Sequence, residues 1–95
     1  MMTMTVFSLL LETTDLEDPE FQTYLRENNI SARKTGVVFG PAGEEVCYTA
    51  ASRLALVDMY TEYFDPYIGE EERAEILATI TESVAPNLRP EREEL

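Results

Sequence analysis

Histidine is missing from this 95-residue chain, and cysteine occurs once, as Cys47. Without histidine the chain has no imidazole general base, no Ser–His or Cys–His pair and no imidazole metal ligand. A single cysteine cannot form an intramolecular disulfide. These absences remove the commonest forms of nucleophilic and metal-assisted catalysis, so the sequence predicts a protein that is not an enzyme and needs no cofactor.

Basic residues are also scarce: seven Lys and Arg stand against 19 Asp and Glu, which gives a net charge of −12. A surface this acidic repels nucleic acid and anionic membranes, so we expect neither as a direct partner. The apolar run at residues 1–11 contains no basic residue, is too short to span a bilayer and ends at Glu12. We therefore expect a cytoplasmic protein, in the host cytoplasm if a phage encodes it.

The apolar content is nevertheless sufficient for a core, since 44% of the residues are hydrophobic. Ninety-five residues suit one domain. We expect a single α+β domain over residues 1–88, and a charged tail over residues 89–95, because Pro86 and Pro90 stop the last helix.

Hydrophobic periodicity and turn residues predict three strands and three helices. The first strand is apolar on both faces, which suits burial on both sides. The segment from Gly40 to Gly43 predicts a hairpin turn between the second and third strands. The expected elements, in the order β-α-β-β-α-α, cover residues 4–11, 19–27, 33–39, 45–50, 51–64 and 70–84.

Each predicted helix has an apolar stripe that faces a core. The second helix also has apolar residues outside its stripe, at Leu56, Met59 and Tyr63. The predicted stripes are Phe21, Tyr24 and Leu25; then Leu54, Val57, Tyr60 or Thr61, and Phe64; then Ile76, Leu77, Ile80 and Val84.

These elements predict a three-stranded sheet with the helices packed on one face. We expect the first two strands to run parallel, joined by the first helix as a crossover. So small a sheet leaves an open edge, and pairing with a second copy through Leu56, Met59 and Tyr63 would form a homodimer.

Two motifs that suggest chemistry have simpler explanations. Cys47 follows Glu44 and Glu45, which do not lower a thiol pKa, so we interpret it as a buried or half-buried strand residue. Residues 65–76 have the length of a calcium loop but place Tyr67 and Gly69 where oxygen ligands belong, and Ile76 where the closing Glu belongs. The sequence therefore predicts no metal site.

Four of the basic residues occur in the middle of the chain, at Arg26, Arg33, Lys34 and Arg53. Residues 26–53 also contain three acids, so the net charge there is too small for a nucleic-acid patch. A cavity formed by these bases, within one chain or across a dimer, would make the protein a sponge for a small signalling nucleotide, which is one alternative function.

Negative charge is concentrated towards the C-terminus, where residues 54–84 hold eight acids and one base, Arg73. Asp58 and Glu62, at i and i+4, share a helix face. Glu71, Glu75 and Glu82 are expected to line up on the last predicted helix. A face of this kind suits a basic surface, with aromatic residues as anchors. The predicted partner-binding residues are Asp58, Glu62, Tyr63, Asp65, Tyr67, Glu70, Glu71, Glu75 and Glu82.

In its size, acidity, lack of catalytic motifs and single domain, the chain resembles the small phage-encoded anti-defence proteins, in particular anti-CRISPR proteins and nucleic-acid mimics. Those proteins share no motif, so no functional residue carries over. The resemblance implies a stoichiometric inhibitor that binds a nuclease or its guide-RNA complex, a possible CRISPR effector, and blocks access to DNA. The alternatives are a homo-oligomeric structural or accessory subunit and the nucleotide sponge.

Overall fold

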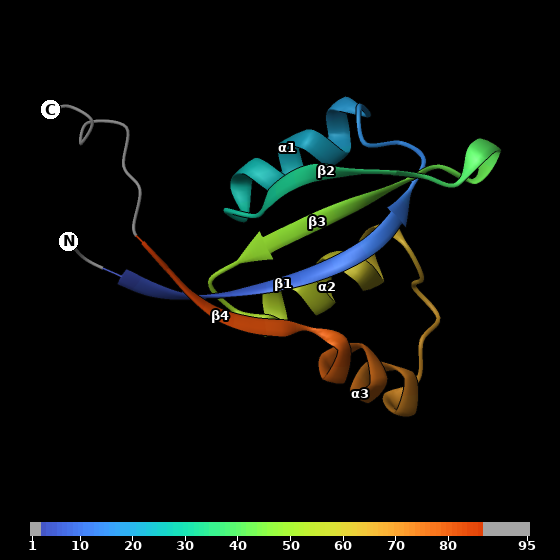
Figure 1. The fold of residues 1–95 in the computed structure, drawn as a ribbon. Helices are drawn as coiled ribbons and strands as arrows, with labels where there is room; N and C mark the ends of the chain where they lie inside the picture. The colour runs from blue at the N-terminus through green and yellow to red at the C-terminus, as the bar shows by residue number, and fades with distance from the viewer. Residues whose placement is uncertain (1–2, 87–95) are drawn as a thin grey trace, which may run out of the picture.

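A computed structural model describes residues 3–86 of the chain (Figure 1). It contains four strands, three α-helices and one short 3-10 helix. In chain order these are β1 (Thr3–Thr13), α1 (Pro19–Glu27), β2 (Ser31–Val38), η1 (Gly40–Ala42), β3 (Glu44–Ala50), α2 (Arg53–Tyr63), α3 (Glu70–Thr79) and β4 (Thr81–Pro86). The expected tail over residues 89–95 lies outside the described residues.

The four strands form one antiparallel sheet in the order β2-β3-β1-β4. β1 and β2 run in the same direction, as predicted, but β3 is inserted between them and pairs with both. A βαβ unit split by a third strand, within the order β-α-β-β-α-β, is the ferredoxin-like arrangement. Here it carries one extra helix, α3, before the last strand.

The α+β class is confirmed, whereas the three-stranded sheet is wrong because a fourth strand follows α3. The helix predicted over residues 70–84 ends at Thr79, and Ile80 has extended dihedral angles, φ −73° and ψ 129°. The Thr79 hydroxyl donates to the carbonyl of Ile76 at 2.8 Å, a local bond that competes with helix continuation. Residues Thr81–Pro86, which include the β-branched Thr81 and Val84, then pair with residues Thr3–Ser8 of β1.

The core lies between the sheet and the helices α1 and α2, which cover one of its faces. Val46, Tyr48 and Ala50 of β3 are buried and alternate with half-buried Cys47 and Thr49, as predicted. The largest fully buried side chains are those of Tyr48, Leu56, Met59, Val46 and Val57.

Helix α2 is rotated relative to its prediction. Leu54, expected in the core, is 55% exposed, whereas Leu56 and Met59 are 0% exposed. The sequence contains two overlapping apolar faces on this helix, and the face with Leu56, Val57 and Met59 is the one that packs in the core. Leu56 and Met59 therefore cannot form the predicted homodimer surface.

The other face of the sheet carries no helix among residues 3–86 (Figure 1). Leu10 is 55% exposed there, so the prediction that the first strand is buried on both sides is wrong. A row of hydroxyl side chains crosses all four strands, because Thr49 pairs with Ser31 and Ser8, and Ser8 pairs with Thr81. The Ser8 and Thr49 hydroxyls are 3.2 Å apart.

Candidate functional site

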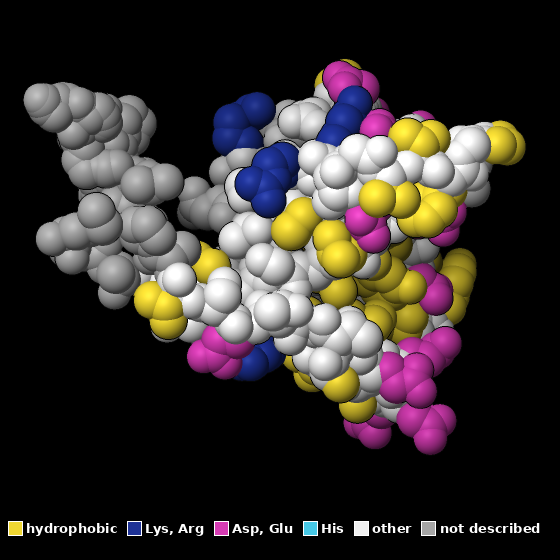
Figure 2. All heavy atoms as spheres, viewed as in Figure 1, with side chains coloured by type: hydrophobic (Ala, Val, Ile, Leu, Met, Phe, Trp, Pro, Cys, Tyr) yellow, Lys and Arg dark blue, Asp and Glu magenta, His cyan; other side chains and the backbone are white. Residues whose placement is uncertain are grey.

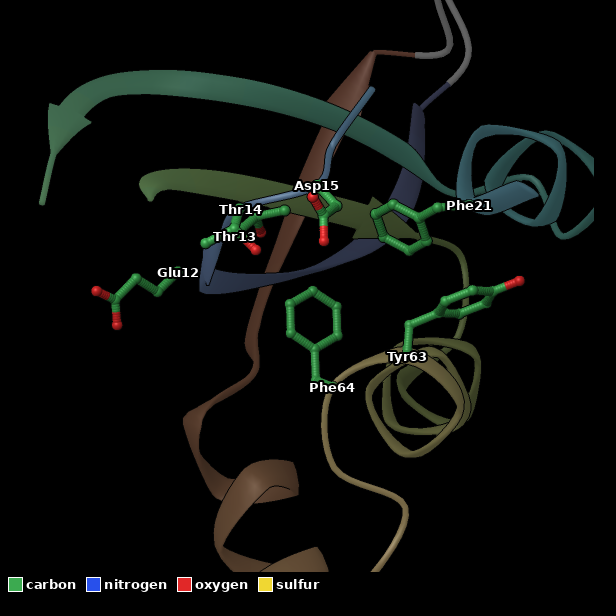
Figure 3. A pocket seen from close by; sticks show the side chains of 7 residues that line it. All are labelled: Glu12, Thr13, Thr14, Asp15, Phe21, Tyr63 and Phe64. Carbon is green, nitrogen blue, oxygen red and sulfur yellow. The ribbon is translucent and has the colours of Figure 1, made fainter. Parts of the chain in front are cut away.

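A pocket of about 230 Å³ opens where β1 ends and the helices α1 and α2 approach each other (Figure 3). In Figure 3 the Asp15 carboxylate points toward the space between the Phe21 and Phe64 rings, whereas Glu12 points away. Tyr63 forms a third aromatic wall, with its hydroxyl directed outward. We call this hollow the Asp15 pocket; its lining is Glu12, Thr13, Thr14, Asp15, Phe21, Tyr63 and Phe64.

The end of β1 is held in place by buried polar and steric contacts. The hydroxyls of Thr13 and Tyr48 are 2.7 Å apart, and Thr13 is 5% exposed. Gly43 has φ +119°, and a Cβ there would lie 2.5 Å from the Thr13 carbonyl oxygen, so glycine is required for this close approach. The Asp15 carbonyl then accepts the Asp18 amide at 3.1 Å. Asp15 therefore sits in a turn that is fixed at both ends.

Phe21 is the centre of the aromatic cluster behind the pocket. Its ring centroid lies 4.9 Å from that of Tyr63, 6.0 Å from Phe64 and 6.1 Å from Tyr48. Separations of this size, with tilted or edge-on rings, are favourable for aromatic pairs. Tyr60 stacks on Phe64 at 5.7 Å. The walls of the Asp15 pocket are therefore packed in place before any ligand arrives.

A second, more open hollow of about 380 Å³ lies on the other side of Tyr63. Tyr24 and Tyr63 meet edge to face there, with ring centroids 5.0 Å apart. We call this hollow the acid–tyrosine groove; its lining is Pro19, Glu20, Thr23, Tyr24, Glu27 and Tyr63. Tyr63 belongs to both hollows, so the two form one continuous surface along α1 and the end of α2.

Burial and the carboxylates of α1 and α2 raise the pKa values of Tyr24 and Tyr63. Partial burial raises the pKa of Tyr63, and the charges of Glu20 and Glu62 raise it further. Burial also raises the pKa of Tyr24, with added effects from Asp58 and Glu62. The part of each shift that comes from the carboxylates reflects a negative potential at the tyrosines, and the same potential attracts a cation.

The structure brings together some of the predicted partner-binding residues. Tyr63 lines the acid–tyrosine groove. Asp58 and Glu62 of α2 lie near enough to Tyr24 for their charges to raise its pKa. Tyr67 is 90% exposed in the turn before α3, where its amide donates to the Asp65 carboxylate at 3.1 Å. Glu70, Glu71 and Glu75 are exposed on α3, which contacts α2. Figure 2 shows Asp and Glu side chains gathered over α3.

Glu82 does not join this group. The prediction that it lines up with Glu71 and Glu75 on a helix is wrong, because Glu82 lies on β4. There its carboxylate bonds to the Arg53 guanidinium at 2.9 Å. Asp58 also has a cation nearby, since Arg73 of α3 approaches its carboxylate to 3.9 Å.

Sequence reasoning missed the half of the site that α1 and the preceding turn supply. Glu20, Tyr24 and Glu27 are spaced i, i+4 and i+7, so they share one helix face, and this signal was available in the sequence. Asp15 and Phe64 offered no such signal, because 48 residues lie between them in the chain. Only the fold brings them to one pocket.

The basic residues proposed for a nucleotide cavity are divided between different carboxylates. Lys34 pairs with Glu44 at 3.2 Å and with Glu17 at 3.9 Å, whereas Arg53 pairs with Glu82. Arg33 lies on β2 and lines a hollow of the open sheet face beside Cys47. In Figure 2 the Lys and Arg side chains lie mainly over α1 and β2, away from the acidic side chains over α3.

Residues 3–86 contain no group of three or more Cys, Asp or Glu side chains placed to hold a metal ion. Within the same residues, every helix is too short or too polar to cross a membrane.

Comparison of the chain with protein-family models, with curated proteins and with solved structures found no match in any of the three. The geometry of the acid–tyrosine groove and the Asp15 pocket is therefore the basis on which a function is proposed.

Proposed function

We propose that this protein is a non-enzymatic binding module whose acidic helix face docks on a basic surface of a partner protein or ribonucleoprotein. The observation that carries the proposal is the Tyr24–Tyr63 pair, with ring centroids 5.0 Å apart and carboxylates from α1 and α2 around it. Partly exposed tyrosines surrounded by acids combine an apolar anchor with a rim that attracts Lys and Arg.

The two parts of this face contribute differently to binding. Carboxylates on the rim speed the encounter with a basic partner and make it sensitive to salt, but each contributes little affinity. The tyrosines supply contact area that loses little conformational entropy on binding. A basic groove that neutralises nucleic acid is the partner that fits best, and occupying it would make the protein a stoichiometric inhibitor of the anti-CRISPR or DNA-mimic kind.

The side chains on the open face of the sheet also favour the helix face as the binding surface. In RNA-binding domains with a four-stranded sheet, aromatic side chains on that face stack with bases. Here the aromatic residues of the strands, Phe7 and Tyr48, belong to the face that the helices cover. Leu10, Cys47 and Thr49 occupy the open face instead, so direct stacking of bases on the sheet is disfavoured.

The test compares two triple charge reversals with the same change in net charge. One reverses Glu20, Glu27 and Glu62 to Lys at the groove; the other reverses Glu70, Glu71 and Glu75 to Lys on α3. Tagged wild-type protein is used to capture partners from host lysate at low salt, followed by elution with salt and competition with duplex DNA. We expect the groove reversal to weaken capture about tenfold more than the α3 reversal.

Three results would contradict the proposal. Equal losses for the two triple variants would mean that net charge alone is responsible. Capture that resists high salt would exclude an electrostatic rim. A captured partner that duplex DNA fails to displace would exclude a nucleic-acid-binding groove as the docking surface.

The second candidate function is that of an accessory subunit in a homo-oligomer. The exposed apolar residues at the end of the β2–β3 hairpin favour it. Val37, Val38 and Phe39 are 47%, 67% and 44% exposed, which is an apolar group at the tip of β2. The edge beside them also carries Arg33 and Lys34, and charges of this kind oppose edge-to-edge pairing. Light scattering that gives a monomer mass at high concentration would dispose of this candidate.

A further inference from the structure

We propose that the Asp15 pocket receives one guanidinium group, supplied by an arginine side chain of the partner. The inference deepens the proposed function and rests on it for the identity of the partner. It concerns one part of the binding face, the hollow capped by Asp15, and it can be tested without the partner.

The shape of the pocket suits the head group of one side chain. Its volume of about 230 Å³ is far larger than the ~10–15 Å³ that a single water needs. Its inner side is formed by the Phe21, Tyr63 and Phe64 rings, and Figure 3 shows the Asp15 carboxylate directed into the space beside them. A planar cation stacks on aromatic faces and bonds to a carboxylate with two parallel N–H groups.

The charges of the pocket select a cation. Asp15 directs its carboxylate into the pocket, whereas the Glu12 side chain lines the pocket but points away from it. No ion pair within residues 3–86 neutralises the Asp15 carboxylate. An anionic ligand would be repelled, and a neutral apolar ligand would remove water from Asp15 and give nothing back. A guanidinium returns charge-assisted hydrogen bonds to that carboxylate.

The pocket is also organised in advance, which lowers the entropy lost on binding. Leu16 is buried, and the bond from the Asp18 amide to the Asp15 carbonyl closes the turn. Behind it, the Thr13–Tyr48 hydrogen bond fixes the end of β1. The backbone of Asp15 and the ring of Phe21 are thus held by separate contacts.

The test is an NMR titration of the isotope-labelled full chain with three small probes. N-acetyl-arginine amide is the cation, N-acetyl-citrulline amide is its neutral isostere, and N-acetyl-lysine amide carries the charge without the planar fork. We expect saturable shifts at Asp15, Phe21 and Phe64 with arginine amide. Its affinity is expected to exceed that of citrulline amide about tenfold, with lysine amide between them.

Asp15→Asn is expected to weaken arginine-amide binding about tenfold, because it removes the charge and keeps the size of the side chain. Glu17→Gln is the matched control, since Glu17 lies in the same turn, outside the pocket lining, and its loss should leave the affinity unchanged. A Phe64→Leu variant tests the aromatic wall independently, and dispersed amide spectra establish that each variant is folded.

Equal binding of arginine and citrulline amides, or shifts that ignore Asp15→Asn, would overturn the inference. That failure is separable from failure of the proposed function. If the probes do not bind while the Glu20, Glu27 and Glu62 reversal still weakens capture more than the α3 reversal, the pocket assignment is wrong and the binding module stands. If the probes bind while the reversal has no effect on capture, the pocket assignment stands and the proposed acidic binding module is wrong.

Discussion

The two faces of the sheet are built from alternate residues of the same strands, yet they differ in almost every physical property. On β1, Leu9 is 4% exposed beneath the helices, while its neighbour Leu10 is 55% exposed on the other face. On β3, Tyr48 is fully buried, whereas Cys47 and Thr49 are half-buried on the open side. The period of two in a strand is sufficient to separate a core from a polar surface.

This contrast between the two faces indicates where a binding site can form in a domain of this size. The large aromatic side chains pack under α1 and α2, and the ones at the margin of that core, Tyr24 and Tyr63, remain partly exposed among carboxylates. The open face has small hydroxyl side chains and Leu10. The binding anchors that we propose therefore lie at the edge of the core, and substitutions on the two faces of the sheet test this contrast.

The largest effect is expected for Leu56→Ala, which opens a cavity beneath α2. Leu56 is 0% exposed, and a substitution of this kind in a core costs about 2–5 kcal/mol of unfolding free energy. Leu54→Ala in the same helix and Leu10→Ala on the open face are matched controls, because both leucines are 55% exposed. Each control should cost less than about 1 kcal/mol, measured by urea denaturation. Equal losses would mean that the contrast between the faces is wrong.

A smaller loss is expected for Gly43→Ala, which strains the point where β3 meets the end of β1. The new Cβ would lie 2.5 Å from the Thr13 carbonyl oxygen at a φ of +119°, so we expect a cost of about 2–3 kcal/mol. Gly40→Ala is the control, because Gly40 has φ +70° but nothing within 4 Å of the added carbon. It should cost about 1 kcal/mol. A thermal scan compares the two variants, and a milder effect at Gly43 would contradict the steric account.

The sequence predicts those elements of the fold that depend on local patterns. The first helix, the β3 alternation and the hairpin followed from local periodicity and turn residues. The fourth strand did not, because Ile76, Leu77, Ile80 and Val84 fit a helical period equally well. Pairing of Thr81–Pro86 with the far end of β1 decides between helix and strand, and that contact is not local.

The residues of the candidate site also fall into those that local patterns predict and those that only the fold brings together. Asp58, Glu62 and Tyr63 were predicted because they lie on one helix, whose spacing the sequence displays. The Asp15 pocket was not predicted, because β1, α1 and α2 each contribute part of its wall. Glu82 was misplaced together with the fourth strand, since its role as a partner-binding residue depended on a helix that ends earlier.

The next effect concerns the buried hydrogen bond between Thr13 and Tyr48. Thr13→Val leaves the Tyr48 hydroxyl without its partner in a buried site, at a cost of about 1–3 kcal/mol. Tyr48→Phe should cost less, because the Thr13 hydroxyl keeps a second acceptor, the Leu11 carbonyl, at 3.4 Å. The double variant should cost less than the sum of the two, as measured by urea denaturation. Strict additivity would contradict a shared bond.

The same pair predicts a loss of stability at alkaline pH. Burial raises the pKa of Tyr48 above its usual value of about 10, and the bond with Thr13 opposes this in part. The folded state thus favours the protonated phenol, so this contribution is complete below about pH 10 and is lost as the pH rises through the folded pKa. Tyr48→Phe should flatten the alkaline loss, and an unchanged pH profile would contradict the assignment.

The smallest effect is expected where the two faces meet at the sheet margin, at the pair Arg53 and Glu82. The guanidinium bonds to Glu82 at 2.9 Å and lies 4.5 Å from the Phe7 ring centroid, but the two charged side chains are 43% and 54% exposed. Glu82→Gln should therefore cost about 0.2–1 kcal/mol at low salt and almost nothing in 1 M salt, because water and ions screen an exposed pair. Arg53→Met should cost slightly more, since it also removes the cation from the Phe7 ring.

Because Arg53 already pairs with the Glu82 carboxylate, Glu82→Gln should leave partner capture at the wild-type level. A loss of capture as large as that of the Glu20, Glu27 and Glu62 reversal would extend the binding face across the sheet margin and remove the distinction between its two sides.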